Sequence, residues 1–499
     1  MVWLFTCMNG ACVSLIVSLF ILWPLLQTAA LAQCAGNVST PSAAADCAAR
    51  ATPQEKIASI DPAHLYTLAE LIDIAEHNNP RTRIAWERAK QRADQLGIAR
   101  SAYYLILAGV ATFADERTIN PFPKPFVPVG YTLVQTPLVQ PEIELHYVLF
   151  DFGRRAAKVD AATAQKLAAG ANFVQLNQDV AFRVASAYYN LQTAQQRLEA
   201  TQETLKTAQT TQDAAENQLR NGRATLPDVL NARAETSQAI FDRESADGDE
   251  KIARVALTES IGVEPTPNIT IDTQANAALP QTLTLSIDAL IDRAITGRPD
   301  LMAQAAEIRA ADDEIRAARA EYRPTLSIAA NGAQTAIWPH SNFGELGSAN
   351  KPTWSAGAVF EWRIFDGGAR KNALAEALSK RREAQDELTE KHDQATREVW
   401  TAYIGFRTAL RKHQAALALF TSANESYSAS LDAYKYGVKN LIDVVTAEKQ
   451  LAQARLSGVA ARSQLLLQAV NLEFVTGNLL RNPPPATSTA QQQDKNEKK

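Results

Sequence analysis

The chain repeats itself once over most of its length, and this repeat restricts the possible folds more than any other feature. The segment 67–80 aligns with 286–299 at an offset of 219 residues, and each segment ends in proline. At an offset of 215 residues, landmarks further along coincide as well: Phe150-Asp151-Phe152-Gly153 with Phe365-Asp366-Gly367-Gly368, Gly222 with Gly437, and Gly262 with Gly477. A register kept across so many positions predicts two structurally equivalent halves.

We predict six segments from this repeat and from local composition. They are a signal peptide (1–32), an N-terminal extension (33–61), a first repeat (62–262), a linker (263–285), a second repeat (286–478) and a disordered tail (479–499). The linker is rich in Pro, Thr and Asn. The tail joins three prolines to a polar run, a composition that is typical of disorder.

The N-terminus predicts export from the cytoplasm. Residues 1–32 carry no charged side chain, and the apolar run 11–23 is followed by Ala30-Leu31-Ala32, a small-x-small cleavage pattern. No Lys or Arg precedes the apolar run, so an uncleaved anchor stays open as the alternative. Cys34 is a candidate for lipidation, although Gln33 stands before it where a small residue is usual. A disulfide between Cys34 and Cys47 is the other option in an oxidising compartment.

Composition and motifs argue against two classes of function. The formal net charge is -4, and Lys and Arg are spread along the chain, so we do not expect nucleic acid as a partner. The His and Cys residues show no metal-binding spacing, and the sequence contains no nucleophile elbow and no phosphate-binding loop. We therefore expect a protein that is not an enzyme and that uses no metal and no cofactor.

Very long helices are predicted in both halves. No proline occurs between Pro141 and Pro227 or between Pro352 and Pro483, and strong helix formers dominate both stretches. A helix of about 70 residues would be roughly 100 Å long. Each is followed by a second helix after Gly222 or Gly437, which predicts helical hairpins over 153–262 and 367–478. A heptad pattern marks the last helix: Val444, Leu451, Gly458, Leu465 and Leu472, with Ala447, Ala454 and Ala461 between them.

Four shorter segments alternate between apolar and polar residues, as strands do. They are 105–116, 141–151, 324–338 and 353–366. Each is about as long as the roughly 9 to 11 residues that a strand needs to cross a bilayer, and an apolar face opposite a polar face is typical of an outer-membrane barrel. A soluble sandwich would alternate too and stays an alternative. We expect the two strands of each half to pair, joined by loops over 119–141 and 338–352.

Four strands are too few to close a membrane barrel, so the strand pattern predicts an oligomer. An open sheet edge in lipid would leave backbone groups without hydrogen bonds. Two copies would supply eight strands around a filled interior, whereas three copies would supply twelve strands around a lumen. The polar face carries Glu142, Glu144, Glu361 and Arg363, which need water. This requirement favours three copies.

Taken together, these residues resemble a known family. The two halves with a proline near the start of each, the Phe-Asp-x-Gly step after a strand, and the hairpin stretches 220–233 and 435–445 look like the TolC family of outer-membrane efflux proteins. The resemblance covers about 62–478. It implies a homotrimer in outer-membrane lipid, with a barrel of twelve strands continued by a helical barrel across the periplasm.

The resemblance also implies partners. A periplasmic adaptor (membrane fusion) protein would meet the helical tips and link them to an inner-membrane transporter of the RND, ABC or MFS class. In this family a Val-Gly-Leu-like step at the tips contacts the adaptor, and the matching positions are Asn221-Gly222-Arg223 and Tyr436-Gly437-Val438. The first step departs from the family pattern because its apolar residues are replaced by polar and charged ones.

Residues that close the periplasmic mouth are carried over from the same resemblance. The links between neighbouring helices fall on Asp228, Tyr434 and Lys439, and a ring of carboxylates falls on Asp443. An Asp bound to a Tyr hydroxyl and paired with a cation would hold a tip yet still release it. A second acidic ring found in some members falls on Thr446, which puts cation selectivity in doubt.

The sequence therefore predicts a fold that is mostly α with a membrane β-barrel part, built from two tandem repeats. Each repeat would contribute one long, coiled-coil-like helical hairpin and two barrel strands. The predicted function is an outer-membrane channel of a tripartite efflux or type I secretion system that conducts its substrates passively. The alternative is a periplasmic coiled-coil protein with a structural or scaffold role.

Overall fold

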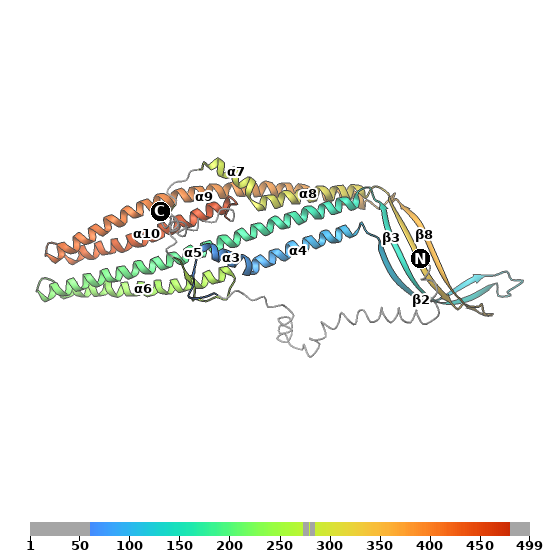
Figure 1. Ribbon diagram of the computed structural model, residues 1–499, viewed down its shortest axis with the longest axis horizontal. Helices are drawn as coiled ribbons and strands as arrows, with labels where there is room; N and C mark the ends of the chain where they lie inside the picture. The colour runs from blue at the N-terminus through green and yellow to red at the C-terminus, as the bar shows by residue number, and fades with distance from the viewer. Residues whose placement is uncertain (1–59, 273–278, 280–284, 480–499) are drawn as a thin grey trace, which may run out of the picture. The chain divides into compact units, whose positions relative to one another are not determined.

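The computed structural model describes residues 60–272, 279 and 285–479, which belong to one compact unit (Figure 1). The predicted signal peptide lies outside the described residues, as do Cys34 and Cys47. Also outside the described residues are the rest of the N-terminal extension up to residue 59, residues 273–278 and 280–284 of the linker, and the tail from residue 480 on.

Both halves follow one order of elements: two helices, two long strands and a hairpin of long helices. The first half contains β1 (Leu65–Tyr66), α3 (Leu68–Asn78), α4 (Pro80–Ser101), β2 (Ile106–Pro121), β3 (Tyr131–Phe150), α5 (Arg154–Arg220), α6 (Leu226–Ile261) and β4 (Thr270–Ile271). The second contains α7 (Ile287–Gly297), α8 (Pro299–Ala320), β5 (Thr325–Ile337), β6 (His340–Ser341), β7 (Gly344–Glu345), β8 (Ala349–Glu361), α9 (Ala369–Lys435) and α10 (Leu441–Val475). The prediction of two tandem structural repeats is confirmed.

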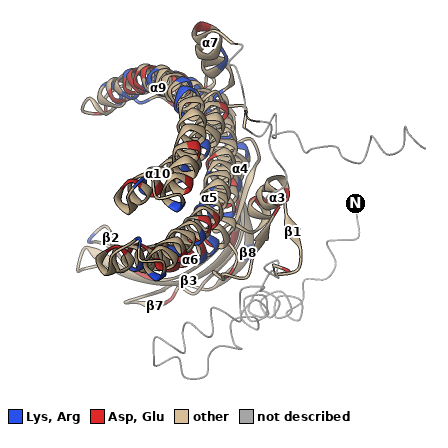
Figure 2. Ribbon diagram, turned by 90° about the vertical axis from the view of Figure 1, so that its left-hand side faces the viewer, with Lys and Arg blue, Asp and Glu red and all other residues tan. Residues whose placement is uncertain are grey.

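The long helices α5 and α9 set the length of the helical part. Each has 67 residues, close to the prediction, and spans roughly 100 Å at 1.5 Å per residue. One pair of shorter helices, α4 and α6, packs on α5, and a second pair, α8 and α10, packs against both α5 and α9. Seen from the hairpin end, the layer of helices follows a curve (Figure 2).

Small residues and narrow seams hold these helices together. The predicted heptad residues of α10 that carry an apolar side chain are buried. They are Val444, Ala447, Leu451, Ala454, Ala461, Leu465 and Leu472. Alanines of α5 pack in the same way, as Ala168 does against Ala303 and Ala306 of α8. Short side chains let helix backbones approach closely, so the helices form a thin curved layer instead of covering a thick core.

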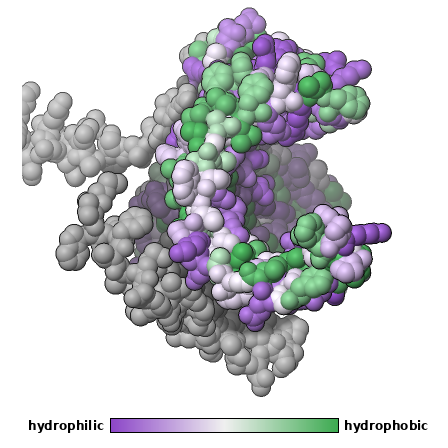
Figure 3. All heavy atoms as spheres, turned by 90° about the vertical axis from the view of Figure 1, so that its right-hand side faces the viewer, coloured by the Kyte–Doolittle hydropathy of each residue, from purple (hydrophilic) through white to green (hydrophobic). Residues whose placement is uncertain are grey.

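The long strands form an antiparallel sheet in the order β2-β3-β5-β8. Its register places apolar residues opposite one another across all four strands, as in the row Leu107, Leu145, Ala330 and Ala356. The next row holds Glu144, Asn331 and Ser355, on the opposite face. The alternation therefore gives the sheet one apolar and one polar face. Viewed from the sheet end, hydrophobic side chains gather over an open arc (Figure 3).

The first predicted loop is wrong in its extent. We placed it at 119–141, but β2 continues to Pro121 and β3 already begins at Tyr131. Two prolines of this segment, Pro137 and Pro141, lie inside β3. Proline lacks the N–H that a ladder needs, and the pairing of β3 with β5 accordingly skips Gln140 and Pro141 while the pairing with β2 continues.

The second hairpin also differs at its ends. Strand β8 covers Ala349–Glu361, whereas 353–366 was predicted, and the short strands β6 and β7 lie within the predicted loop 338–352. Beyond Glu361, Trp362 and Ile364 continue the apolar alternation and stay exposed, but they pair with no strand among the described residues. Alternation marks residues that could extend a strand, while pairing also needs a partner strand of equal length.

The repeated Phe-Asp-x-Gly step turns a strand into a long helix. Gly153 and Gly368 adopt positive φ, of 86° and 91°, directly before α5 and α9. The Oδ2 atom of Asp151 accepts hydrogen bonds from the backbone N of Arg155, at 2.9 Å, and from its Nε, at 3.0 Å. Asp366 and Arg370 repeat both contacts in the second half. The carboxylate thus caps free N–H groups of the first helical turn.

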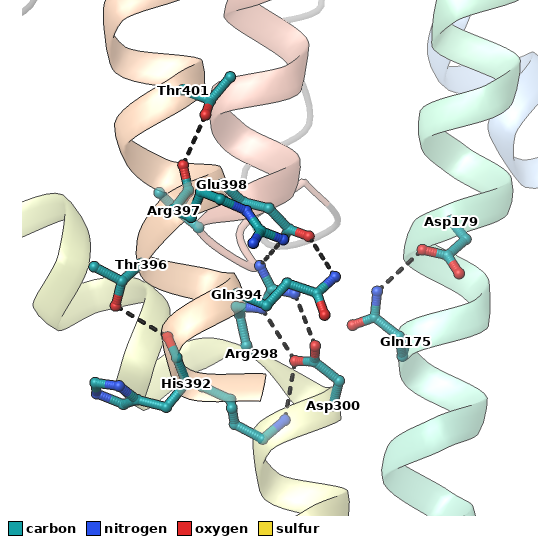
Figure 4. Close-up of polar contacts among 12 residues, drawn as sticks. Gln175, Asp179, Arg298, Asp300, His392, Gln394, Thr396, Arg397, Glu398 and Thr401 are labelled. Atoms are coloured by element: carbon teal, nitrogen blue, oxygen red, sulfur yellow. Dashed lines mark hydrogen bonds and ion pairs between the residues drawn. The ribbon is translucent and has the colours of Figure 1, made fainter. Parts of the chain in front are cut away.

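An ion-pair cluster around the buried Arg298, with two partly exposed carboxylates, lies at the start of α8 (Figure 4). The Nη2 atom of Arg298 lies 2.7 Å from Oδ2 of Asp300, and its Nη1 atom lies 2.5 Å from Oε2 of Glu398 on α9. The equivalent residue of the first half is Asn79, whose side chain accepts from the backbone N of Arg81. The two halves therefore share a backbone but anchor it with different chemistry.

Candidate functional site: the paired hairpin tips

The two hairpins turn in the same way at their tips. At the first tip, the N–H of Gly222 donates to the carbonyl of Leu219 (2.9 Å) and the N–H of Arg223 to that of Gln218 (2.8 Å). At the second tip, Gly437 and Val438 donate to Tyr434 and Ala433 at the same two distances. These contacts form a Schellman motif, which needs a left-handed residue, and the two glycines have φ of 73° and 74°.

Each returning helix begins with a polar cap. The Oδ2 atom of Asp228 accepts hydrogen bonds from the backbone N of Thr225 (2.9 Å) and from its hydroxyl (2.7 Å). In the second half, the side chain of Asn440 accepts from the backbone N of Asp443 at 2.9 Å. Asp228 is therefore engaged in capping α6, whereas the carboxylate of Asp443 is exposed.

Tyr434 lies in the seam between the hairpins, close to Asp228. Its ring packs in a cluster with Val229, Leu431, Leu441 and Val444. Its hydroxyl is buried and has no hydrogen-bond partner among the described residues. Burial raises the pKa of this hydroxyl, and the nearby carboxylate of Asp228 raises it further. Buried polar groups usually have a hydrogen-bond partner, so this unpaired donor near a carboxylate is an exception to the rule.

The other two predicted gate residues lie apart from this pair. The Nζ atom of Lys439 donates to the hydroxyl of Ser430 at 3.1 Å. Within the described part of the chain, no hydrogen bond or ion pair joins Lys439 or Asp443 to Asp228 or Tyr434. One chain thus brings together Asp228 and Tyr434, and leaves Lys439 and Asp443 facing outward.

The exposed residues of the two tips differ sharply in chemistry. The second tip presents Tyr436, which is 83% exposed, and Val438, which is 79% exposed. The first tip presents Asn221 and Arg223 at the equivalent positions, both exposed. Apolar side chains at such exposure mark an interaction surface when they are grouped, and Ile442 extends the group on the second tip.

A buried amide joins the two tips and was not identified from the sequence. The Nε2 atom of Gln218, near the end of α5, donates to the carbonyls of Tyr434 (3.2 Å) and Lys435 (2.9 Å) at the end of α9. Carbonyls in the last turn of a helix have no partner within the helix. Gln218 therefore supplies from the first hairpin a cap that the second hairpin lacks.

Further from the tips, a buried polar cluster crosses the same seam. The Oε2 atom of Glu448, a residue only 6% exposed, accepts from the hydroxyl of Thr211 at 2.7 Å. That hydroxyl also lies 3.2 Å from the hydroxyl of Tyr427, and Nη1 of Arg455 donates to Thr207 at 3.1 Å. The cluster thus links α5, α9 and α10.

Burial raises the pKa of Glu448. The hydrogen bond from Thr211 acts against this shift, the charge of Glu235 adds to it, and the charges of Lys449 and Arg455 oppose it without cancelling it. The sequence carried one signal of this position, because Glu448 directly follows the heptad residue Ala447 and so lies beside the seam.

Among the residues that the structure describes, no helix combines the length and the apolar character required to cross a membrane. The same part of the chain holds no group of three or more His, Cys, Asp or Glu side chains that could bind a metal ion.

Comparison with known proteins agrees with the repeated architecture. The family model described as "Outer membrane efflux protein" matches residues 71–263 and 290–478, one match for each half. Protein CyaE of Bordetella pertussis is 27% identical over 416 residues, which cover 83% of this chain and 85% of that protein. Outer membrane efflux protein BepC of Brucella suis is 23% identical over 423 residues, covering 83% and 86%.

Solved structures show the same fold. A membrane protein from Pseudomonas aeruginosa superposes with a TM-score of 0.68 at 24% identity and covers 82% of this chain and 93% of that chain. A structure of CusC gives the same TM-score at 20% identity, with 82% and 92% covered. Since the family model matches well over half of the chain, in two blocks that coincide with the two repeats, the chain belongs to the outer membrane efflux protein family.

Proposed function

We propose that this outer-membrane protein is the passive export channel of a tripartite system, and that three copies form one duct. The long helices would cross the periplasm, and the sheet would lie in the membrane. Transport energy would come from an inner-membrane transporter of the RND, ABC or MFS class, linked to the duct by a periplasmic adaptor. Efflux of small molecules and type I secretion are both compatible with this arrangement.

The sheet, with its four long strands, is the observation that carries the proposal. Among the described residues, β2 pairs with β3 alone and β8 with β5 alone, so both edges offer unpaired backbone groups. Trp354, Phe360 and Trp362 are exposed near one edge. An apolar face in lipid cannot tolerate open edges, because each unpaired N–H or C=O costs several kcal/mol there. Pairing β8 of one copy with β2 of the next would close twelve strands from three copies.

The hairpin tips would then perform two tasks at the periplasmic end. We assign adaptor contact to the exposed tip positions Asn221, Gly222, Arg223, Tyr436, Gly437 and Val438. We assign closure of the mouth to Asp228, Tyr434, Lys439 and Asp443. Within one chain Lys439 bonds to Ser430 and makes no described contact with Asp228, so we place the link between these two residues between neighbouring copies.

Planar-bilayer conductance of the detergent-purified protein tests the proposal, with the oligomer mass measured in parallel. We expect a trimer that passes small currents in its closed state. A water-soluble species that conducts no current in lipid would overturn the proposal. It would favour the alternative of a coiled-coil scaffold protein.

A further inference from the structure

A groove between α4 and α5 has features of a binding site and is separate from the tips. Its volume is about 650 Å3, within the range of roughly 300–1,000 Å3 that is usual for small-molecule sites. Phe173 and Leu176 of α5 form part of an apolar wall. The ring of Phe173 is held in place by an edge contact with Trp86, with centroids 5.6 Å apart.

Positive charge dominates the same groove. Arg81, Arg88 and Arg92 of α4 line it, while Glu307 of α8 is the one acidic side chain of the lining. Within the described residues, the guanidinium groups of Arg81 and Arg88 have no hydrogen bond or ion pair, and that of Arg92 donates to Oε1 of Gln95 at 2.8 Å. Guanidinium groups without carboxylate partners are suited to bind carboxylate, sulfonate or phosphate groups.

The lining of the groove comes from three helices, α4, α5 and α8. Helices α4 and α8 both pack on α5, and the charge of Arg92 acts on Glu307 across that helix. The groove is therefore lined by side chains from α5 and from the two helices that pack on it.

We propose that this groove binds amphipathic organic anions, with the acidic group on Arg81, Arg88 and Arg92 and the apolar body against Phe173 and Leu176. An apolar wall beside unpaired guanidinium groups discriminates against cations and against neutral molecules of the same shape. The role of the groove in transport, as a resting place for anionic cargo, rests on the proposed export function. Binding itself does not depend on it.

Isothermal titration calorimetry on the full chain in a neutral detergent tests the proposal. Naphthalene-2-sulfonate is the probe, and naphthalene-2-sulfonamide is its uncharged counterpart. We expect the sulfonate to bind about tenfold more tightly or better, since hydrogen bonds to a charged group are stronger than those between neutral groups. The triple variant R81Q/R88Q/R92Q should lose this preference, and K90Q, on the same helix but outside the groove, should keep it.

Each outcome has a clear meaning. Equal affinity for the two probes, or sulfonate binding that is unchanged in the triple variant, would overturn the proposal. Variants that keep the oligomer mass and helical content of the parent exclude misfolding as the cause of lost binding. Conductance of the same samples reports separately on the duct, so a failure of the groove and a failure of the export function are distinguishable.

Discussion

The two hairpin tips have the same backbone and opposite surfaces. Both end in a Schellman turn at a glycine of positive φ, and both returning helices start with a polar cap. Arg223 on one tip corresponds to Val438 on the other, and both are exposed. The turn thus depends on the glycine and the cap alone. The side chains at the remaining tip positions can therefore differ without changing the turn. Such a difference would suit two tips that bind different surfaces of a partner protein.

The contact between the tips is also one-sided. Gln218 of the first hairpin caps the end of α9, but the equivalent position of the second hairpin is Ala433, which has no side-chain donor. A duplicated chain has therefore become asymmetric where its halves meet. The end of α9 receives a side-chain cap from the first hairpin, and the second hairpin returns no equivalent bond to the end of α5 among the described residues.

The largest effect is expected from Gln218→Leu. Removing the amide leaves the carbonyl of Lys435 without its donor and the carbonyl of Tyr434 with the N–H of Gly437 alone, which should destabilise that end by roughly 2 kcal/mol. Native-state hydrogen exchange at 431–435 measures this loss, with α6 as an internal reference. Gln212→Leu is the matched control, since Gln212 bonds within its own helix, to Glu216. Equal losses of protection in both variants would contradict a special role for Gln218.

A second test concerns the gate. Replacing Asp228 and Lys439 by alanine should loosen the closed mouth and raise single-channel conductance severalfold. Asp228 also caps α6, and loss of a cap costs about 1 kcal/mol. Thr225→Ala helps to separate the two roles, because it removes the hydroxyl contact of the cap and keeps both the carboxylate and its bond to the backbone N of residue 225. If Thr225→Ala raises conductance as much as the double variant does, the effect comes from the cap and Asp228 has no separate part in the gate.

The buried cluster at Glu448 predicts a pH dependence of the contact between the hairpins. The pKa of Glu448 is raised in the folded chain, chiefly by burial, so its ionised form is disfavoured there. The contact is therefore strongest below the unfolded pKa and weakens as pH rises through the folded pKa. Glu235 and Lys449, which form an ion pair at 2.8 Å, and Arg455 also face this carboxyl group.

Glu448→Gln should remove this dependence. The glutamine stays neutral at every pH and keeps an oxygen for the hydroxyl of Thr211, so the contact should be tighter at neutral pH. Hydrogen exchange at 207–218, corrected for the intrinsic effect of pH, measures the change. The exposed Glu425 provides the control variant E425Q, which should behave as the parent. A persisting pH dependence in E448Q would assign it to another group.

Much of the fold follows from local sequence features. The absence of proline over long stretches predicted α5 and α9, and the heptads of α10 mark residues that are buried. Helices α4 and α8 were not assigned, although each begins with proline at its first position, a usual start signal. The early start of β3 was missed because proline usually argues against a strand. Pro137 and Pro141 fit into β3 because the neighbouring strand does not need an N–H at those positions.

The site itself was predictable only in part. Gly222 and Gly437 were found because a left-handed turn needs glycine, and that need is local. Gln218 and Glu448 were missed because their partners lie more than 200 residues away along the chain. The role of such a residue depends on the packing of one hairpin on the other, which no local pattern contains.

The smallest effect should come from exchanging the chemistry of the tips. The variant N221Y/R223V gives the first tip the residues of the second, and we expect the free energy of unfolding to change by less than about 0.5 kcal/mol, as for other exposed positions. Gly222→Val in the same turn should cost about 1–2 kcal/mol, because a side chain is strained at φ of 73°. Denaturant unfolding of the two variants side by side measures both values. A loss of more than 1 kcal/mol in N221Y/R223V would mean that these side chains serve the fold. An unchanged stability would mean that these side chains do not serve the fold and are available to bind a partner. The two tips would then differ in what they bind and not in how they fold.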